Sequence, residues 1–323
     1  MKPEEILINV SLDSANDFLD AIAPRGEYFK TIPPDYDWIF RGHGDDSNYR
    51  LLPSALRPEQ REDLLRISRA STYIREHIEL QLCQVAAEMY LLNDFIRLAD
   101  RSGLPIPNES SEWRQRVNLF KVKIQDGLVE NRLLAGSDLA WPTTDFIPAM
   151  ALARHCGLPT RLLDWSYSSF IAAYFAAEDA LRKSKAGTPT EYLSVWALHR
   201  VNMMVGAMLA LTPSDSTFPI GITSAPLATN KNLHAQRGVF TFEFITELSV
   251  PKNQSVLPLD ELIINCVRDI DRLETLPIMY HFILKGSEAP KLLWLLSKEG
   301  IDASRLFPGY EGVVRYMNLR TMY

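Results

Sequence analysis

The chain has 323 residues, which is enough for one large domain or two ordinary ones. Hydrophobic residues make up 46% and charged residues 23%, a composition typical of globular proteins. The formal net charge of −6 argues against a protein built to bind the phosphate backbone of nucleic acids, although it leaves room for a local basic pocket.

The cysteines and the apolar segments exclude several classes of protein. Cys83, Cys156 and Cys266 are far apart and form no C-x-x-C pair, so we expect neither a disulfide framework nor a metal site. The first residues, MKPEEILINV, lack the long apolar core of a signal peptide. No apolar run approaches the roughly 18 residues needed to cross a bilayer. These features predict a cytoplasmic protein without a membrane partner.

The first part of the chain predicts one strand followed by a helical insertion. Residues 1–35 form a lead-in, and a strand is expected over 38–42, where the polar turn GHGDDSN ends it. From about 61 to 101 apolar residues recur at helical spacing without Gly or Pro, which predicts two helices or one bent helix. Another helix is expected near 113–132, so the insertion spans about 58–135. Its outer face is expected to be solvated, with a partner surface as the alternative, and to carry Arg75, Glu76, Glu79 and Glu88.

The stretch ARHCGLPTRLLDWSYSSFIAAYFAAEDA predicts the end of a helix, a short strand and a new helix. A helix capped by Thr144 ends at Gly157, as a glycine followed closely by a proline predicts. The next strand is expected over 160–165, because the segment between the breakers is too short for a helix. Ser166 or Ser168 would then cap a helix whose alanines let it lie close to a sheet.

Two charges flank the apolar pair in TRLLDW. Arg161 and Asp164 are three residues apart, so in a strand their side chains point to opposite faces and are poor partners for each other. Each needs another charged partner or a ligand, because burying an unpaired charge is costly. We favour a structural partner for Arg161 and a ligand site for Asp164. Trp165 is either a core aromatic residue, which we favour, or a surface on which a base stacks.

The last third of the chain predicts two more strands. They are expected over 191–198, EYLSVWAL, and over 238–245, GVFTFEFI, where three phenylalanines alternate with other residues at period two. KLLWLLSKEG is expected to form a short helix. The sequence therefore predicts an α+β fold in which one extended domain, residues 36–323, carries the helical insertion.

Four stretches together resemble the FRG-domain family. They are Phe40-Arg41-Gly42, the segment HCGLPTRLLDWSYSSFIAAYFAAEDA, the strand region NLHAQRGVFTF and the closing segment LFPGYEGVV. The three-residue match alone would be uninformative, but the long central segment with the others in the same order is specific. The resemblance covers roughly residues 36–315.

The order of these parts resembles that of ADP-ribosyltransferases, which implies a mixed-sheet core and NAD as the substrate, without a metal. In that class an arginine of the first strand lies against the NAD phosphates, a role that suits a forked guanidinium. The cofactor-binding residues that the resemblance implies are Arg41, Gly42, His155, Arg161 and Trp165. An ion pair of Arg41 with an acid such as Asp164 is the structural alternative. His43, next to the signature, is expected to be a solvated turn residue.

The same resemblance implies which residues act in catalysis. Cleavage of the glycosidic bond of NAD passes through an oxocarbenium-like ribose, which a carboxylate or an amide dipole stabilises. Most enzymes of this class use a glutamate of the late strand; here Gln236 stands at that place, able to hydrogen-bond the ribose but not to act as a base. Glu243 is an odd number of residues further on, which places it on the opposite face. Gln236 and Asp164 are therefore the catalytic candidates.

Three functions remain open at this point. The first is an ADP-ribosyltransferase-like enzyme that uses NAD to modify an unknown acceptor, which is a protein, a nucleic acid or a small molecule. Family association adds a bacterial or phage-related origin and a role as a toxin or in defence. The second is a non-catalytic module that binds a nucleotide or a protein on the same fold, which the missing glutamate favours. The third is an NAD glycohydrolase that shares the site but has no acceptor.

Overall fold

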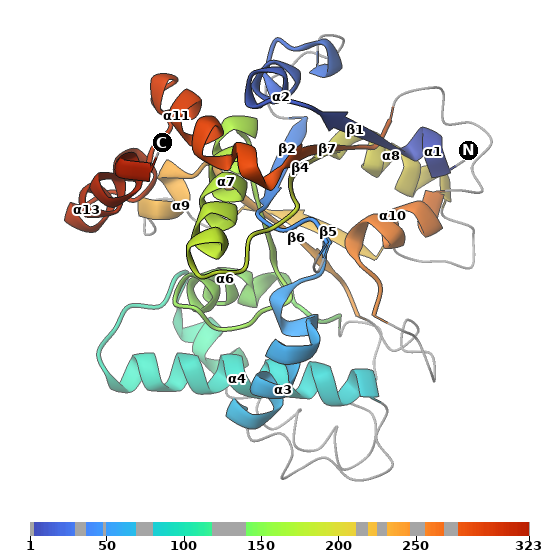
Figure 1. The fold of residues 1–323 in the computed structure, drawn as a ribbon. Helices are drawn as coiled ribbons and strands as arrows, with labels where there is room; N and C mark the ends of the chain where they lie inside the picture. The colour runs from blue at the N-terminus through green and yellow to red at the C-terminus, as the bar shows by residue number, and fades with distance from the viewer. Residues whose placement is uncertain are drawn as a thin grey trace.

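The computed structural model describes residues 3–29, 37–47, 50–68, 80–117, 140–210, 219–224, 231–245, 256–267 and 277–322. These residues form an α+β fold in which helices surround a seven-stranded mixed sheet (Figure 1). None of the helices among the described residues combines the length and the apolar character needed to cross a membrane.

The sheet is mostly antiparallel. Its strands are β1 (Leu7–Leu12), β2 (Trp38–His43), β3 (Leu163–Ser166), β4 (Tyr192–His199), β5 (Ile220–Thr223), β6 (Gly238–Glu243) and β7 (Met279–Lys285). They lie in the order β1-β7-β4-β2-β3-β6-β5. Only β1 and β7 pair in parallel. β1, near the start of the sequence, and β7, in its last part, therefore lie side by side at one edge of the sheet.

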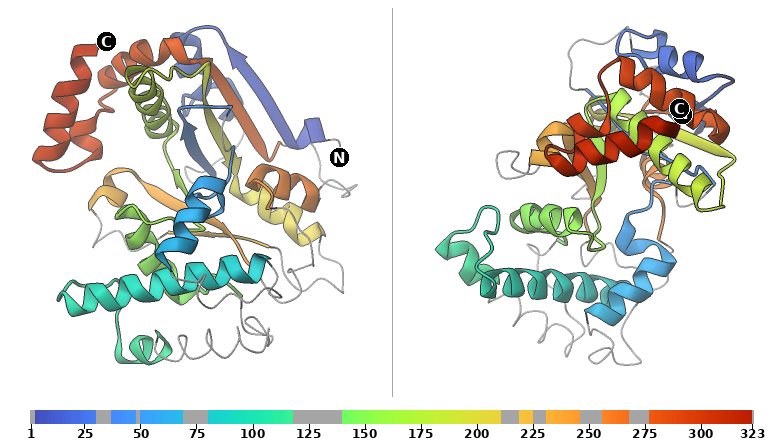
Figure 2. Two further views of the ribbon diagram at one scale, coloured as in Figure 1. Left: turned by 60° about the horizontal axis from the view of Figure 1, so that its bottom comes forward. Right: turned by 60° about the vertical axis from the view of Figure 1, so that its left-hand side comes forward.

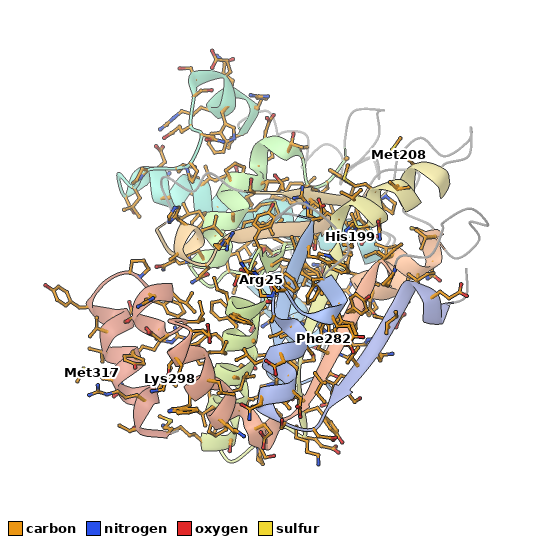
Figure 3. All side chains as sticks on the ribbon, turned by 90° about the horizontal axis from the view of Figure 1, so that it is seen from above. Arg25, His199, Met208, Phe282, Lys298 and Met317 are labelled. Atoms are coloured by element: carbon orange, nitrogen blue, oxygen red, sulfur yellow. The ribbon has the colours of Figure 1, made fainter. Side chains whose placement is uncertain are left out.

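Helices lie on both faces of the sheet and at one end of the molecule. They are α1 (Pro3–Ile6), α2 (Ala15–Ile22), α3 (Pro58–Ile67), α4 (Leu80–Arg101), α6 (Ile147–His155), α7 (Ser169–Lys185), α8 (Arg200–Ala210), α9 (Lys231–Ala235), α10 (Leu259–Val267), α11 (Ala289–Lys298), α12 (Ala303–Leu306) and α13 (Tyr310–Leu319). In both views of Figure 2, α4 lies at the opposite end of the molecule from α2. Seen from above, Met317 of α13 and Met208 of α8 lie far apart at opposite sides (Figure 3).

Most of the expected elements are confirmed. The strands predicted at 38–42, 191–198 and 238–245 correspond to β2, β4 and β6, and the helices after Thr144 and Ser168 correspond to α6 and α7. The strand predicted at 160–165 corresponds to β3, which begins only at Leu163; the Thr160 amide donates to the Ser54 hydroxyl at 3.1 Å instead of to a neighbouring strand.

Three strands were not predicted, and one charged residue that was expected on a solvated face is buried. β1, β5 and β7 are additional, and β1 and α2 come from the segment expected to be a lead-in. The described part of the helical insertion consists of α3, α4 and helical residues 111–117, and the remainder of the helix expected near 113–132 lies outside the described residues. Arg75, Glu76 and Glu79 also lie outside them. Glu88 is not on a solvated face: it is 4% exposed, because α4 packs it against buried partners.

Helix α7 lies unusually close to β2. The alanines predicted to allow this approach, at positions 172, 173, 176 and 177, are all buried. A Cβ atom added to Gly42 would lie 1.9 Å from the carbonyl oxygen of Ala172, so β2 requires a glycine at this point. The small residues on both sides thus explain why the Gly of the Phe-Arg-Gly signature is needed.

The sheet is weakly joined at its centre. β2 pairs with β4 over six residues, but it pairs with β3 only at Phe40 and Ser166. Residues of both strands next to this single pair line a large cavity. The fold therefore opens between β2 and β3, and the motif residues lie at the opening.

Candidate functional site

A cavity of about 910 Å³ collects the charged residues of the sequence motifs. Residues of strands β2, β3 and β6 line it, together with residues of α3, α6, α7, α9, α13 and the segment before α13. Its basic lining residues are Arg41, Arg57, Arg154, Lys183 and Arg315. Its acidic lining residues are Asp45, Asp63, Asp164 and Asp179. The volume lies in the range of small-molecule and cofactor sites.

Arg41 is held at the opening between β2 and β3. Its Nη1 donates to the carbonyl oxygen of Asp164 at 2.7 Å, and its Nε donates to Nε2 of His43 at 3.1 Å. Nη1 also lies 3.6 Å from Oδ2 of Asp164. Burial, opposed by Asp164 and reinforced by Arg154 and Arg57, lowers the pKa of Arg41 to about 10. In the free protein, burial and the neighbouring arginines therefore destabilise the charged form of Arg41, and a bound anion would stabilise it.

Asp164 is paired with an arginine that the sequence analysis did not single out. Nε of Arg154 donates to Oδ1 of Asp164 at 2.5 Å, and Nη2 of Arg154 donates to Oδ2. Nη1 of the same guanidinium donates to the Ser54 hydroxyl at 2.9 Å. Burial acts to raise the pKa of Asp164, but Arg154 and then Arg41 outweigh it and hold the pKa below its ordinary value. The carboxylate is therefore ionised at neutral pH, and its side chain is 48% exposed.

His43 is buried, so the expectation of a solvated turn residue was wrong. It is 8% exposed and accepts the hydrogen bond from Arg41, which requires an unprotonated Nε2. Burial, with Arg41 and Arg57 next in size, holds the pKa of His43 well below its ordinary value. A neutral His43 fixes the direction in which the Arg41 guanidinium points.

Gln236 lines the same cavity from the turn between α9 and β6. Its side-chain Nε2 donates to the main-chain carbonyl oxygen of Leu306 at 3.3 Å. Its main-chain carbonyl oxygen accepts a hydrogen bond from the Ser166 hydroxyl at 2.8 Å. The next residue, Arg237, has a positive φ of 50°. Glu243 does not line the cavity, but parity is not the reason, because Gln236 precedes β6 and the turn at Arg237 breaks the alternation. Asp164 and Gln236 thus share one cavity, with Ser166 between them along its wall.

Two of the residues expected to contact the cofactor belong to the core instead. Arg161 does not line the cavity: its Nε and Nη2 donate to the two carboxylate oxygens of Glu88 at 3.0 Å and 2.9 Å, in a pair that is almost fully buried. Trp165 borders the cavity, but its side chain packs in the core, and its Nε1 donates to the Thr241 hydroxyl at 2.8 Å. Arg161 therefore needs no ligand, and the core interpretation of Trp165 is confirmed.

The two remaining expected residues lie on the cavity. Gly42 lines it through the backbone of β2. His155, the last residue of α6, lines it with an exposed side chain whose Nε2 lies 3.3 Å from the Asn232 amide nitrogen. Six of the seven candidates thus line the cavity: Arg41, Gly42, His155, Asp164 and Gln236, together with Trp165, whose side chain packs in the core.

Several lining residues were missed, because their positions depend on the fold. Arg154 stands next to His155 in the quoted motif, and only the turn of α6 towards β3 brings it to Asp164. Lys183 bonds to Asp45 at 3.2 Å, and Arg315 bonds to Glu178. Their sequence signal is only that basic residues lie near the recognised motifs. Among the described residues, no group of three or more His, Cys, Asp or Glu side chains is arranged to hold a metal ion.

The fold and the cavity define an α+β protein with a cluster of arginines around a buried opening in its sheet. Residues 36–185 match the family model of the FRG domain, so this part of the chain carries an FRG domain. The match runs from β2 to α7 and includes Arg41, Arg154 and Asp164. Comparisons with curated proteins and with solved structures gave no match.

Proposed function

We propose that this protein is an ADP-ribosyltransferase-like enzyme that binds NAD in the cavity and transfers ADP-ribose to an acceptor. The observation that carries the proposal is the cluster of Arg41, Arg154 and Arg57 on one cavity, in which the first two pair with Asp164. Three guanidinium groups with one carboxylate between two of them favour a dianionic ligand such as a diphosphate. The likeness of the fold to ADP-ribosyltransferases, a cytoplasmic location and a role as a toxin or in defence in bacteria belong to the same proposal and rest on the family resemblance.

The diphosphate of NAD fits the electrostatics around Arg41. A phosphate oxygen near its Nη atoms would offset both the burial of the guanidinium and the repulsion from Arg154 and Arg57. His43 and the Asp164 carbonyl oxygen hold the fork in place, so little side-chain entropy is lost when the ligand binds. The approach of α7 to β2 at Gly42 fixes the strand that carries this arginine.

The chemistry assigns a part to each polar group. The bond between the ribose C1′ and the nicotinamide nitrogen breaks, and nicotinamide leaves as a neutral molecule with the electron pair. The C1′ carbon then bonds to the acceptor nucleophile, which loses its proton to the solvent. Asp164 stabilises the positive charge that develops on the ribose, and Gln236 donates a hydrogen bond to a ribose hydroxyl. With water as the acceptor the same site gives an NAD glycohydrolase.

One observation favours the alternative of a non-catalytic module. Both oxygens of Asp164 are engaged by Arg154, and Arg41 lies within 3.6 Å, which weakens the field that the carboxylate presents to a ribose. No glutamate lines the cavity among the described residues. The module would bind the nucleotide through the same arginines without cleaving it.

Labelled NAD distinguishes these functions. The protein is incubated with a bacterial lysate and NAD that carries the label on its adenylate phosphate, and the products are identified by mass spectrometry. The enzyme transfers label to a defined acceptor with wild type, and Arg41→Ala abolishes the transfer. Free labelled ADP-ribose with no labelled acceptor would indicate the glycohydrolase. Bound but intact NAD would indicate the module.

A further inference from the structure

The closing segment LFPGYEGVV contributes an aromatic wall to the cavity. Phe307, between α12 and α13, and Phe175 of α7 both line it, and both rings remain partly exposed. Their centroids are 6.1 Å apart with an interplanar angle of 89°, an edge-to-face pair. In Figure 1, α13 and α9 lie beside α7, whereas α3 lies below it. The wall thus belongs to a different part of the molecule from α3, which also lines the cavity.

The wall is rigid because polar contacts hold it from two sides. The guanidinium carbon of Arg315 lies over the Phe307 ring, 4.0 Å from its centroid. Glu178, a buried carboxylate of α7, fixes that guanidinium with hydrogen bonds of 2.5 Å and 2.7 Å. The Gln236 amide bonds the carbonyl of Leu306, directly before Phe307. A fixed pair of an aromatic ring and a guanidinium is a surface on which planar bases stack.

We propose that Phe307, with Phe175 and Arg315, forms the subsite that binds the adenine ring of NAD by stacking. The proposal rests on the proposed function and adds the orientation of the dinucleotide. The diphosphate lies at Arg41, Arg57 and Arg154, and the nicotinamide ribose lies at Asp164.

Charge decides which of the two rings of NAD faces the wall. The nicotinamide ring of NAD is a cation, so the Arg315 charge disfavours it there. Adenine is neutral, and it stacks on both an aromatic face and a guanidinium plane. The carboxylate that stabilises an oxocarbenium ion must lie at the nicotinamide ribose. Asp164 makes its contacts with Arg41 and Arg154, whereas the contacts of the wall are with Glu178 and Gln236.

The test compares three ligands by titration calorimetry: ADP, which has adenine and a diphosphate, nicotinamide mononucleotide, and inorganic pyrophosphate. The variants are Phe307→Ala, Phe307→Leu, which keeps apolar volume but removes the ring, and Phe307→Tyr, which keeps the ring. Tyr310→Ala is the matched control, because Tyr310 stands in the same segment, is 93% exposed and does not line the cavity.

We expect Phe307→Ala and Phe307→Leu to weaken ADP binding by about tenfold or more. Binding of nicotinamide mononucleotide and pyrophosphate should stay unchanged, which also shows that the variants are folded, and Phe307→Tyr and Tyr310→Ala should bind ADP like wild type. Unchanged ADP affinity, an equal loss for pyrophosphate, or a loss confined to nicotinamide mononucleotide would overturn the adenine subsite while leaving NAD binding intact. Failure of wild type to bind NAD or ADP would instead refute the proposed function, and the subsite with it.

Discussion

The guanidinium of Arg154 spans both carboxylate oxygens of Asp164, and this pair forms one wall of the cavity. The pairing keeps Asp164 ionised and fixes the direction of its carboxylate. The positive charge of Arg154 also weakens the electrostatic field that this carboxylate presents to a ligand. If Asp164 stabilises the ribose cation, its charge matters in the transition state and not in the bound ground state.

Asp164→Asn keeps the size of the side chain and an oxygen for Arg154 but removes the charge. We expect turnover to fall at least tenfold, equivalent to about 1.4 kcal/mol of transition-state stabilisation, with little change in NAD affinity. Steady-state kinetics and calorimetry measure the two quantities separately. Asp63→Asn removes another lining carboxylate, which pairs with Arg66 on α3, and should leave both unchanged. Equal losses of turnover in the two variants would argue against a special role for Asp164.

Arg41 is expected to contribute mainly to ligand binding and little to the stability of the fold. Arg41→Ala removes a charge-assisted hydrogen bond to the diphosphate, and NAD affinity should fall by about 1.5–3 kcal/mol. Arg41→Lys keeps the charge without the fork and should recover only part of the affinity. Calorimetric titration with NAD measures the loss, and thermal unfolding of the free variants is the control. A large fall in melting temperature together with unchanged affinity would show that Arg41 is there for the fold.

Arg161 provides the opposite case. Its partner Glu88 also accepts a hydrogen bond from Nε1 of Trp141 at 2.7 Å, and Glu243 lies 3.7 Å from the guanidinium. Arg161→Met would leave two carboxylates near each other without their cation, so we expect the free energy of unfolding to fall by about 3–5 kcal/mol. Urea denaturation measures it. NAD affinity of the folded variant should match that of wild type. A selective loss of affinity at unchanged stability would show instead that Arg161 contributes to ligand binding.

The low pKa of His43 makes stability depend on pH. In the unfolded chain His43 takes up a proton below about pH 6.5, whereas the folded protein resists this until a much lower pH. The unfolded state therefore binds more protons, and stability falls as the pH decreases, by roughly 1 kcal/mol between pH 6.5 and 5.5 from this residue.

The matched variant is His43→Gln, which keeps an acceptor for Arg41 and does not titrate. Denaturant unfolding of both proteins across pH 5 to 8 isolates the contribution of His43 from that of His199, whose pKa burial also lowers. The stability difference between wild type and variant should shift in favour of the variant at low pH. Parallel pH profiles would contradict a neutral, buried His43.

Local pattern explains which parts of the fold were predictable. β2 and β6 have clear composition and alternation, and Gly157 and Gly187 end their helices with positive φ. β1 and β7 were missed because they pair with each other across almost the whole chain, so neither has a local partner that marks it.

The candidate site shows the same contrast between features that a local sequence pattern predicts and contacts that depend on the fold. Arg161 and Asp164 were expected to need separate partners, and the structure places one in the core and the other on the cavity, although Arg161 precedes β3 and does not follow the alternation of that strand. The partners could not be read from spacing, because Glu88 is 73 residues from Arg161, and Arg154 reaches Asp164 only through the turn at Gly157. His43 was misjudged because a turn-like sequence gives no sign of the elements that cover it.

Nicotinamide release tests the central claim most directly. Wild-type protein is incubated with NAD, with and without lysate as a source of acceptor, and free nicotinamide is followed over time beside Asp164→Asn and Arg161→Met. We predict release by wild type that the lysate accelerates, release at least about tenfold slower for Asp164→Asn, and release by Arg161→Met in proportion to its folded fraction. No release by wild type under either condition, while NAD still binds, would contradict the enzyme and leave a nucleotide-binding module.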